Sequence, residues 1–231
     1  MDLPVGLRYL LNRDPLFEGI TAFLLLAYVL GVVYGTKFLY NYMRKRGASH
    51  SVAVYYNRKL IHIFAGGVVA LLVPKVFTGA AIPLALSILL AFITYLPHRG
   101  GKLMYWFQVE ENMYEVNFCL MWGLTLTLAW ILLGNPLYGI VPIVFMAFGD
   151  AVTGIVRNAV FGRRTKHWLG NLAMLAVSLP AGVFMAGLVG GLAAAVASFI
   201  ERFELKPIDD NVLISLCSLA VLLLGGAAGM L

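Results

Sequence analysis

Charged side chains are scarce in this sequence. Asp, Glu, Lys and Arg make up 12% of its 231 residues, whereas 61% are hydrophobic and the mean hydropathy is +0.87. A soluble domain of this length needs more charge to cover its surface. The composition therefore excludes an ordinary soluble protein and indicates an all-α, polytopic integral membrane protein.

Other features are sparse or missing, and each absence excludes a class of structure or processing. The two cysteines, Cys119 and Cys217, lie inside apolar runs, so two buried, reduced thiols are expected rather than a disulfide. No Ser-rich or Pro-rich linker divides the chain, which favours one membrane-embedded domain over residues 1–231. The N-terminal stretch MDLPVGLRYLLNRD lacks a basic region followed by an apolar core, so no removable signal peptide is expected.

The common soluble-enzyme signatures are also missing. The sequence has no His/Cys cluster with zinc spacing, no GxSxG and no GxxxxGK[ST]. The net charge of +6 lies at membrane depth without a soluble module, which argues against a nucleic-acid partner.

What the chain does have is a series of apolar runs, near residues 16–40, 60–74, 80–96, 116–133, 137–156, 169–186, 187–200 and 212–230. Several are shorter than the roughly 20 residues of a straight spanning helix, so some must be short, tilted or broken. The Gly/Ala-rich stretch Gly170–Ile200, with Pro180 inside it, suits one long tilted helix or a tight pair of short ones. The pair is favoured because it places all polar segments on one face, and it gives about eight crossings instead of seven.

Charge is distributed unevenly between the two sets of connecting segments. The segments 37–59, 97–115, 157–168 and 201–211 carry 14 of the 17 Lys and Arg residues. The positive-inside rule places these segments in the cytoplasm and the N-terminus outside. Eight of the eleven acidic residues fall on the same face, Asp150 included. Acids and bases gathered on one face indicate a site as well as an orientation signal.

The segment KLMYWFQVEENMYE, residues 102–115, mixes aromatic residues with three glutamates. It is interpreted as an interfacial helix, with Tyr105 and Trp106 at the headgroup level and the glutamates in water. A route for substrate is the alternative.

The first polar motif is NRKLIHIFAGG, residues 57–67. Arg58 and His62 are four residues apart and therefore share a helix face. A cation pair at this position is also typical of a positive-inside anchor. A histidine already within the membrane nevertheless favours a function, because intramembrane ionisable groups are costly.

The second motif is GDAVTGIVRNAVFGRRTKHW, residues 149–168. Gly149 is expected to break the helical run just before Asp150, and a basic loop containing Gly162 follows. A carboxylate beside a Gly-containing basic loop suits Mg²⁺ and the phosphates of a nucleotide. The predicted phosphate-binding residues of this loop are Arg163, Arg164 and Lys166. An anionic-lipid patch and an Asp150–arginine pair remain as alternatives.

The third motif is ERFELKPIDDN, residues 201–211. Asp209 and Asp210 lead into Asn211 at the start of the last apolar run. Paired carboxylates suit Mg²⁺, but acids and Asn are also good helix N-caps, so both interpretations stand.

Taken in order, the three motifs resemble the CTP-dependent polyprenol kinase family, which includes dolichol, phytol and CTP-dependent diacylglycerol kinases. The matching positions span residues ~58–214. They are Arg58, Lys59, His62 and Gly66; Gly149, Asp150, Ala151, Gly162, Arg163 and Arg164; and Glu201, Asp209, Asp210 and Asn211. One departure stands out: relatives often carry Lys-Ser/Thr-x-Glu-Gly after the basic loop, whereas here the Ser/Thr is His167 and the Glu is Leu169.

The resemblance implies an integral-membrane enzyme that transfers the γ-phosphoryl group of CTP to an isoprenoid alcohol. Asp150, Asp209 and Asp210 are the expected Mg²⁺ ligands, with Glu201, Asn211, Gly149 and Gly162 in support. Arg58 and Lys59 join the three basic-loop residues on the triphosphate, and His62 accepts or positions the alcohol proton. The lipid tail is expected between the Gly-rich helices. CTP enters only through the resemblance, and a cytidylyltransferase, an anionic-lipid transporter and a structural lipid-binding protein are the alternatives.

Overall fold

The computed structural model describes residues 5–162, 165–203 and 208–231. The elements are α1 (Val5–Leu10), α2 (Pro15–Lys45), α3 (His50–Ile61), η1 (His62–Gly67), α4 (Val68–Val76), α5 (Ala81–Arg99), α6 (Tyr114–Leu133), α7 (Pro136–Val144), η2 (Phe145–Gly149), α8 (Asp150–Phe161), α9 (Trp168–Ile200) and α10 (Asp210–Ala227). An isolated bridge joins Val109 and Asn112, and the described residues contain no strand. The predicted all-α architecture is confirmed.

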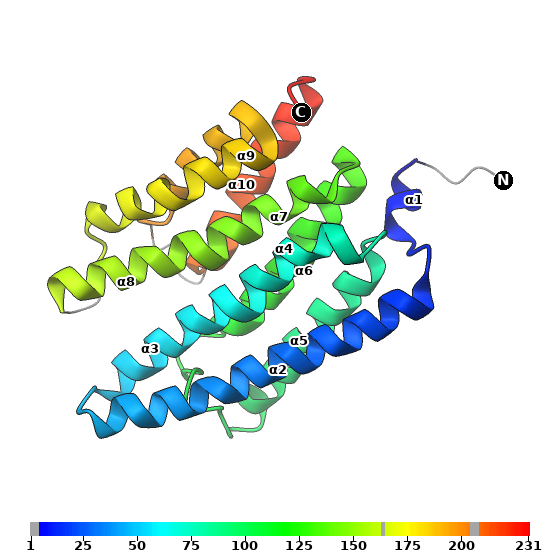
Figure 1. Ribbon diagram of the computed structural model, residues 1–231. Helices are drawn as coiled ribbons and strands as arrows, with labels where there is room; N and C mark the ends of the chain where they lie inside the picture. Colours follow the sequence, from blue (N-terminus) through cyan, green and yellow to red (C-terminus); the bar gives the residue numbers. More distant parts are fainter. Residues whose placement is uncertain (1–4, 163–164, 204–207) are drawn as a thin grey trace.

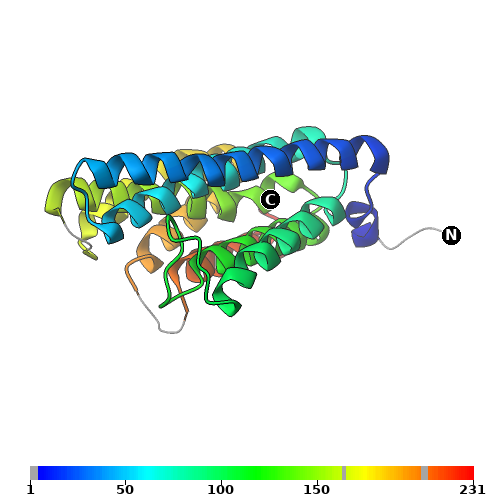
Figure 2. The same ribbon diagram turned by 90° about the horizontal axis from the view of Figure 1, so that it is seen from below.

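Seven helical segments in the described part of the chain are long and apolar enough to cross a membrane. They coincide with the predicted apolar runs, and they lie side by side with their long axes in one general direction (Figures 1 and 2). Helix α2 exposes large apolar side chains on its outer face: Phe23 is 69% exposed and Phe38 is 79% exposed. Large apolar residues at this exposure need a hydrocarbon solvent. The chain is therefore an integral membrane protein.

The longest segment, α9, folds back on itself as a helical hairpin. Ala186 and Gly187 leave the helical conformation, and Gly187 has a φ of 53°, which a residue with a side chain rarely adopts. The backbones of Gly182 and Gly190 touch, so an added Cβ on either residue would strike the other. The two legs still lie together near their far ends, where Asn171 donates to the Ser198 carbonyl at 2.5 Å. The predicted pair of short helices is thus confirmed over the single long one.

Two π-helices lie inside spanning segments and adjoin the polar motifs. η1 begins at His62, and η2 ends at Gly149, immediately before Asp150. The expectation that Gly149 ends the helix is wrong, because the helix continues through α8 to Phe161. Gly149 instead allows close packing, since a Cβ there would lie 2.5 Å from the Ser178 hydroxyl. π-helical turns are rare and frequently accompany functional sites.

The segment before α6 is not the interfacial helix that was expected. It forms turns, and Trp106 and Phe107 are buried in a small apolar core against α2 and α3. The Trp106 indole donates to the Val33 carbonyl at 2.9 Å, and Asn57 donates to the Trp106 carbonyl at 3.0 Å. These hydrogen bonds fix the segment to the bundle, so burial and not interfacial amphipathicity explains its aromatic residues.

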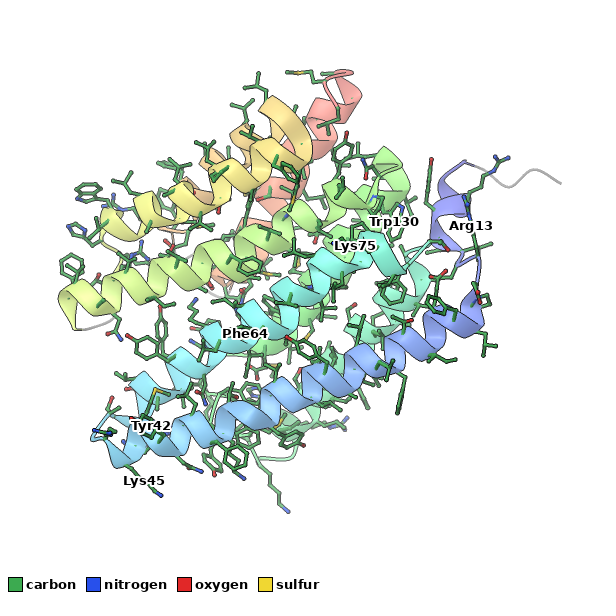
Figure 3. All side chains as sticks on the ribbon, viewed as in Figure 1. Arg13, Tyr42, Lys45, Phe64, Lys75 and Trp130 are labelled. Atoms are coloured by element: carbon green, nitrogen blue, oxygen red, sulfur yellow. The ribbon has the colours of Figure 1, made fainter. Side chains whose placement is uncertain are left out.

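Charged residues divide between the two ends of the bundle. Lys45 lies at one end, while Arg13 and Lys75 lie at the other (Figure 3). The C-terminal end of α10 also lies at the second end, where Gly226 packs against Leu133. At the same end Gly134 packs against Tyr9, because a Cβ added to Gly134 would lie 3.2 Å from the Tyr9 hydroxyl. With the α9 hairpin counted as two passes, the chain starts and finishes at the same end. Cys119 and Cys217 are free thiols, each partly buried.

Candidate active site

A polar cavity of about 590 Å³ opens at the end of the bundle that carries most of the charge. Its volume falls within the roughly 300–1,000 Å³ usual for small-molecule sites. Four cations and four carboxylates are among its lining residues: Arg58, Lys59, Arg157 and Lys166, and Glu111, Asp150, Glu201 and Asp210. The cavity thus combines residues from α3, η1, α6, α8, α10 and the connections between helices.

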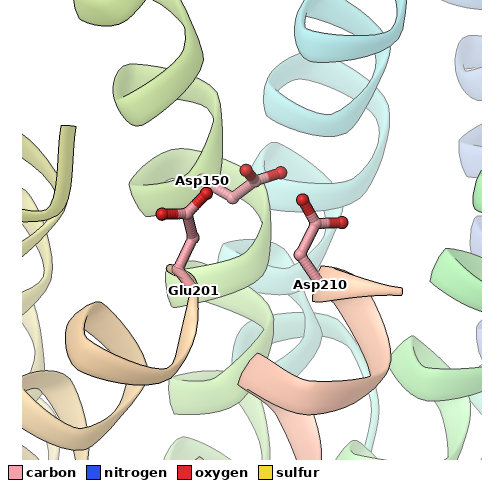
Figure 4. A group of neighbouring side chains, drawn as sticks. All are labelled: Asp150, Glu201 and Asp210. Carbon is pink, nitrogen blue, oxygen red and sulfur yellow. The ribbon is translucent and has the colours of Figure 1, made fainter. Parts of the chain in front are cut away.

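Three of these carboxylates converge. One oxygen each from Asp150, Glu201 and Asp210 lies within 4.8 Å of the other two (Figure 4). They come from the start of α8, the end of α9 and the start of α10. An all-oxygen donor set of this size suits a hard divalent cation such as Mg²⁺, so these residues fit the metal that the sequence predicted.

Each converging carboxylate faces a cation. The Lys59 ammonium donates to Asp150, and both side chains are more than 90% buried. The Arg157 guanidinium donates two hydrogen bonds of 2.8 Å, one to each oxygen of the Glu201 carboxylate. Lys166 donates to a Glu201 oxygen at 3.0 Å and lies 3.9 Å from Asp210. Asp150 is therefore paired with Lys59, and not with an arginine as the alternative interpretation had it.

Arg157 connects α8 to both ends of the α9 hairpin by hydrogen bonds. Its guanidinium also donates to the His167 carbonyl and to the Asn171 side chain, each at 2.9 Å. It crosses α9 at Gly170, where an added Cβ would strike the guanidinium. Close packing against Arg157 therefore requires a glycine at position 170. His167 is the N-cap of α9: its ring nitrogen Nδ1 accepts a hydrogen bond from the Leu169 amide at 3.2 Å. Ser or Thr is more usual at an N-cap position.

Asp209 lies apart from the acidic group. It accepts from the Val212 amide at 3.1 Å as the N-cap of α10, and from Asn117 at 2.9 Å. Burial raises the pKa of the Asp209 carboxyl above its ordinary value, although both hydrogen bonds act in the opposite direction. The structure gives this position the capping role and places Glu201, expected only as support, among the three converging carboxylates.

His62 forms the inner wall of the cavity. Its ring stacks on Phe118, with centroids 4.0 Å apart and planes 19° from parallel. The side chain is 4% exposed, yet neither ring nitrogen has a hydrogen-bond partner among the described residues. Buried polar atoms are normally paired, so an unpaired imidazole at a cavity wall is a candidate ligand contact.

Arg58 and Asn211 complete this wall. The Arg58 guanidinium lies over the Tyr114 ring, 4.2 Å from its centroid, and one of its nitrogens is buried without a partner in the described chain. Asn211 donates to the Tyr114 carbonyl at 3.2 Å, while its own carbonyl oxygen is unpaired there. The stacking on Tyr114 holds the guanidinium at the cavity without using its donors.

The structure brings together most of the predicted site. Arg163 and Arg164 fall outside the described residues. Gly162 ends α8 with a φ of 61° and lines the cavity. Neither Arg157 nor Asn171 was among the predicted site residues. Arg157 is seven residues after Asp150, two helical turns along the same face, and that spacing was a usable signal.

Among the described lining residues, the four cations balance the four carboxylates in formal charge. Comparisons with protein-family models, curated proteins and solved structures found no match to this chain.

Proposed function

We propose that the protein is a Mg²⁺-dependent lipid kinase that transfers the γ-phosphoryl group of CTP to an isoprenoid alcohol. The observation that carries the proposal is the convergence of Asp150, Glu201 and Asp210 beside buried cations in one cavity at the membrane edge. The cavity faces the cytoplasm in this proposal, as the distribution of Lys and Arg predicts. CTP as the donor rests on the resemblance alone.

Phosphoryl transfer needs in-line positioning and charge stabilisation more than covalent help from the protein. Arg58, Lys59 and Lys166 bind the triphosphate oxygens, and the Tyr114 stack orients the first of them. The predicted contribution of Arg163 and Arg164 is to extend this basic surface. When bound, Mg²⁺ neutralises charge on the phosphates, and Asp150, Glu201 and Asp210 hold it.

The reaction is an exchange of one P–O bond for another. The alcohol oxygen forms a bond to the γ-phosphorus as the bond between that phosphorus and the β–γ bridging oxygen breaks, which releases CDP. His62 accepts the hydroxyl proton at a ring nitrogen that has no partner in the described chain. Its stacking on Phe118 holds the ring plane at the cavity wall.

The test is an incubation of purified protein with Mg²⁺, a panel of prenols and CTP labelled at the γ or the α phosphate. A kinase places the γ label in the lipid fraction, and chelation of Mg²⁺ stops the transfer until the ion is restored. Transfer of the α label to lipid instead identifies a cytidylyltransferase. A lipid fraction free of both labels overturns the enzymatic proposal in favour of a transporter or a lipid-binding protein.

The matched variants are Asp150→Asn and Asp14→Asn. Asp150→Asn removes a charge from the converging carboxylates and is expected to lower turnover by at least about 100-fold. Asp14 is an exposed N-cap at the start of α2, where Asn caps equally well, so its variant should keep wild-type turnover. Near-wild-type turnover in Asp150→Asn would refute the mechanism.

A further inference from the structure

A second, apolar cavity lies among the helices, lined by α2, α3, η1, α4, α5 and α6, by Phe77 and by Phe107. Its volume is about 100 Å³, roughly one-sixth of the polar cavity. The α2 wall extends from Leu25 to Val33, which is about 12 Å at 1.5 Å per residue. We call this cavity the apolar slot.

The apolar slot and the polar cavity meet at two residues. Arg58 and His62 line both. These two side chains also carry buried nitrogens without partners in the described chain. A molecule that lies in the slot with a polar end at His62 would therefore present that end to the phosphate-binding cavity.

The wall that holds His62 is fixed by hydrogen bonds to the π-helix. A π-turn leaves backbone carbonyls without their usual helical partners. The Trp122 indole donates to the Gly66 carbonyl at 3.1 Å, and the Tyr28 hydroxyl donates to the Phe64 carbonyl at 3.1 Å. Gly66 has no room for a Cβ because Phe118 lies against it. These contacts make a rigid, preformed wall, as is usual for ligand sites.

We propose that the apolar slot binds the hydroxyl-proximal part of a single-chain lipid alcohol and delivers its hydroxyl to His62. This inference rests on the proposed function and names its acceptor class. The slot has a volume of only about 100 Å³, so it is proposed to admit one hydrocarbon chain and to exclude a diacylglycerol, whose two chains diverge beside the hydroxyl. This proposal places the tail in the apolar slot and not between the Gly-rich helices, which are in backbone contact at Gly182 and Gly190.

The first experiment measures binding without nucleotide. A prenol that carries a photoreactive diazirine near its hydroxyl is crosslinked to the purified full-length protein, and the labelled positions are mapped by mass spectrometry. Labels are expected at slot residues such as Val29, Val69 and Leu86. Unlabelled prenol should displace the probe, and dioctanoylglycerol should not. Labels confined to lipid-facing positions, or equal displacement by both competitors, would overturn the inference.

Two pairs of variants test the slot itself. Leu86→Trp fills the slot from α5, and Ile88→Trp places the same bulk on a side chain that is 52% exposed. Val69→Phe and Leu71→Phe form a second pair on α4, where Leu71 is 41% exposed. The slot variants should lose crosslinking at least fivefold and kcat/KM for a long prenol at least tenfold, while their partners stay within twofold. Unchanged crosslinking in both slot variants, each shown to be folded by size exclusion, contradicts the slot.

The two proposals can fail separately. Slot crosslinking without label transfer from CTP refutes the kinase and retains the slot as a lipid-binding site. Label transfer without slot crosslinking retains the kinase and refutes the slot.

Discussion

At the scale of single residues, the site is a set of mutually dependent buried charges. Lys59 and Arg157 are 6% and 4% exposed, and their carboxylate partners Asp150 and Glu201 are 3% and 2% exposed. A charge removed from water at this depth is stabilised only by its partner and by hydrogen bonds. Lys59, which is proposed to bind phosphate, is therefore also a structural residue through its pairing with Asp150.

The Lys59–Asp150 pair gives a stability prediction that is independent of any activity. Lys59→Met leaves Asp150 buried and unpaired, and it should destabilise the protein by about 3–5 kcal/mol. Adding Asp150→Leu removes the orphaned charge and should restore most of that loss. Thermal unfolding in detergent measures both, as a double-mutant cycle. A double variant as unstable as Lys59→Met would show that the pair itself is not the source of the loss.

Asp209 and its helix cap give a second residue-scale prediction. Asp209→Asn keeps an oxygen for the Val212 amide and should retain turnover within about threefold of wild type, since Asn caps as well as Asp. Asp209→Ala should lose about 1 kcal/mol of stability. Turnover and melting temperature of the two variants are the measurements. A loss of Mg²⁺ affinity in Asp209→Asn comparable to that in Asp150→Asn would return this residue to the metal site.

At the scale of elements, hydropathy predicted nearly every spanning helix, because a membrane demands long apolar runs. It could not predict the η1 and η2 turns, since π-helices arise from packing between segments distant in sequence. The prediction of an interfacial helix over 102–115 was wrong because this segment, too, is determined by packing against distant segments. Trp106 is buried by α2 and α3, contacts that local composition does not reveal.

The α9 hairpin depends on glycines that touch across its two legs. Gly190→Ala drives a Cβ into the Gly182 carbonyl and should cost about 1–3 kcal/mol. Gly31→Ala, in α2 with nothing within 4 Å of the added Cβ, should be neutral or slightly stabilising. Melting temperatures in the same detergent compare the two. Equal stability of both variants would contradict the close approach of the legs.

The predictability of the candidate site differs from that of the helices. Motif order identified Asp150, Asp210, Lys59 and His62 as polar groups on one face, since each lies within or beside an apolar run. The choice between Asp209 and Glu201 could not be made, because it depends on how α9 returns to α10. Only the folded hairpin brings Glu201 to Arg157 and Lys166.

At the scale of the whole molecule, the charge asymmetry and the position of the polar cavity make one topological prediction. The end that carries Arg46 and the cavity should be cytoplasmic, and the end that carries Lys75 should be outside. On a background with Cys119→Ser and Cys217→Ser, Lys75→Cys should react with an impermeant maleimide in intact cells. Arg46→Cys should react only after permeabilisation. Both side chains are exposed, so accessibility within the protein does not bias the comparison.

The orientation also decides whether the proposed donor can reach the cavity, because nucleoside triphosphates are made and held in the cytoplasm. A cavity on that side has access to the proposed donor, while the apolar slot receives its acceptor from the bilayer, and the two meet only at Arg58 and His62. The reverse labelling pattern would place the cavity outside, where no such donor is supplied. It would contradict a kinase that draws its donor from the cytoplasm, and would favour a role in handling anionic lipids at the outer face.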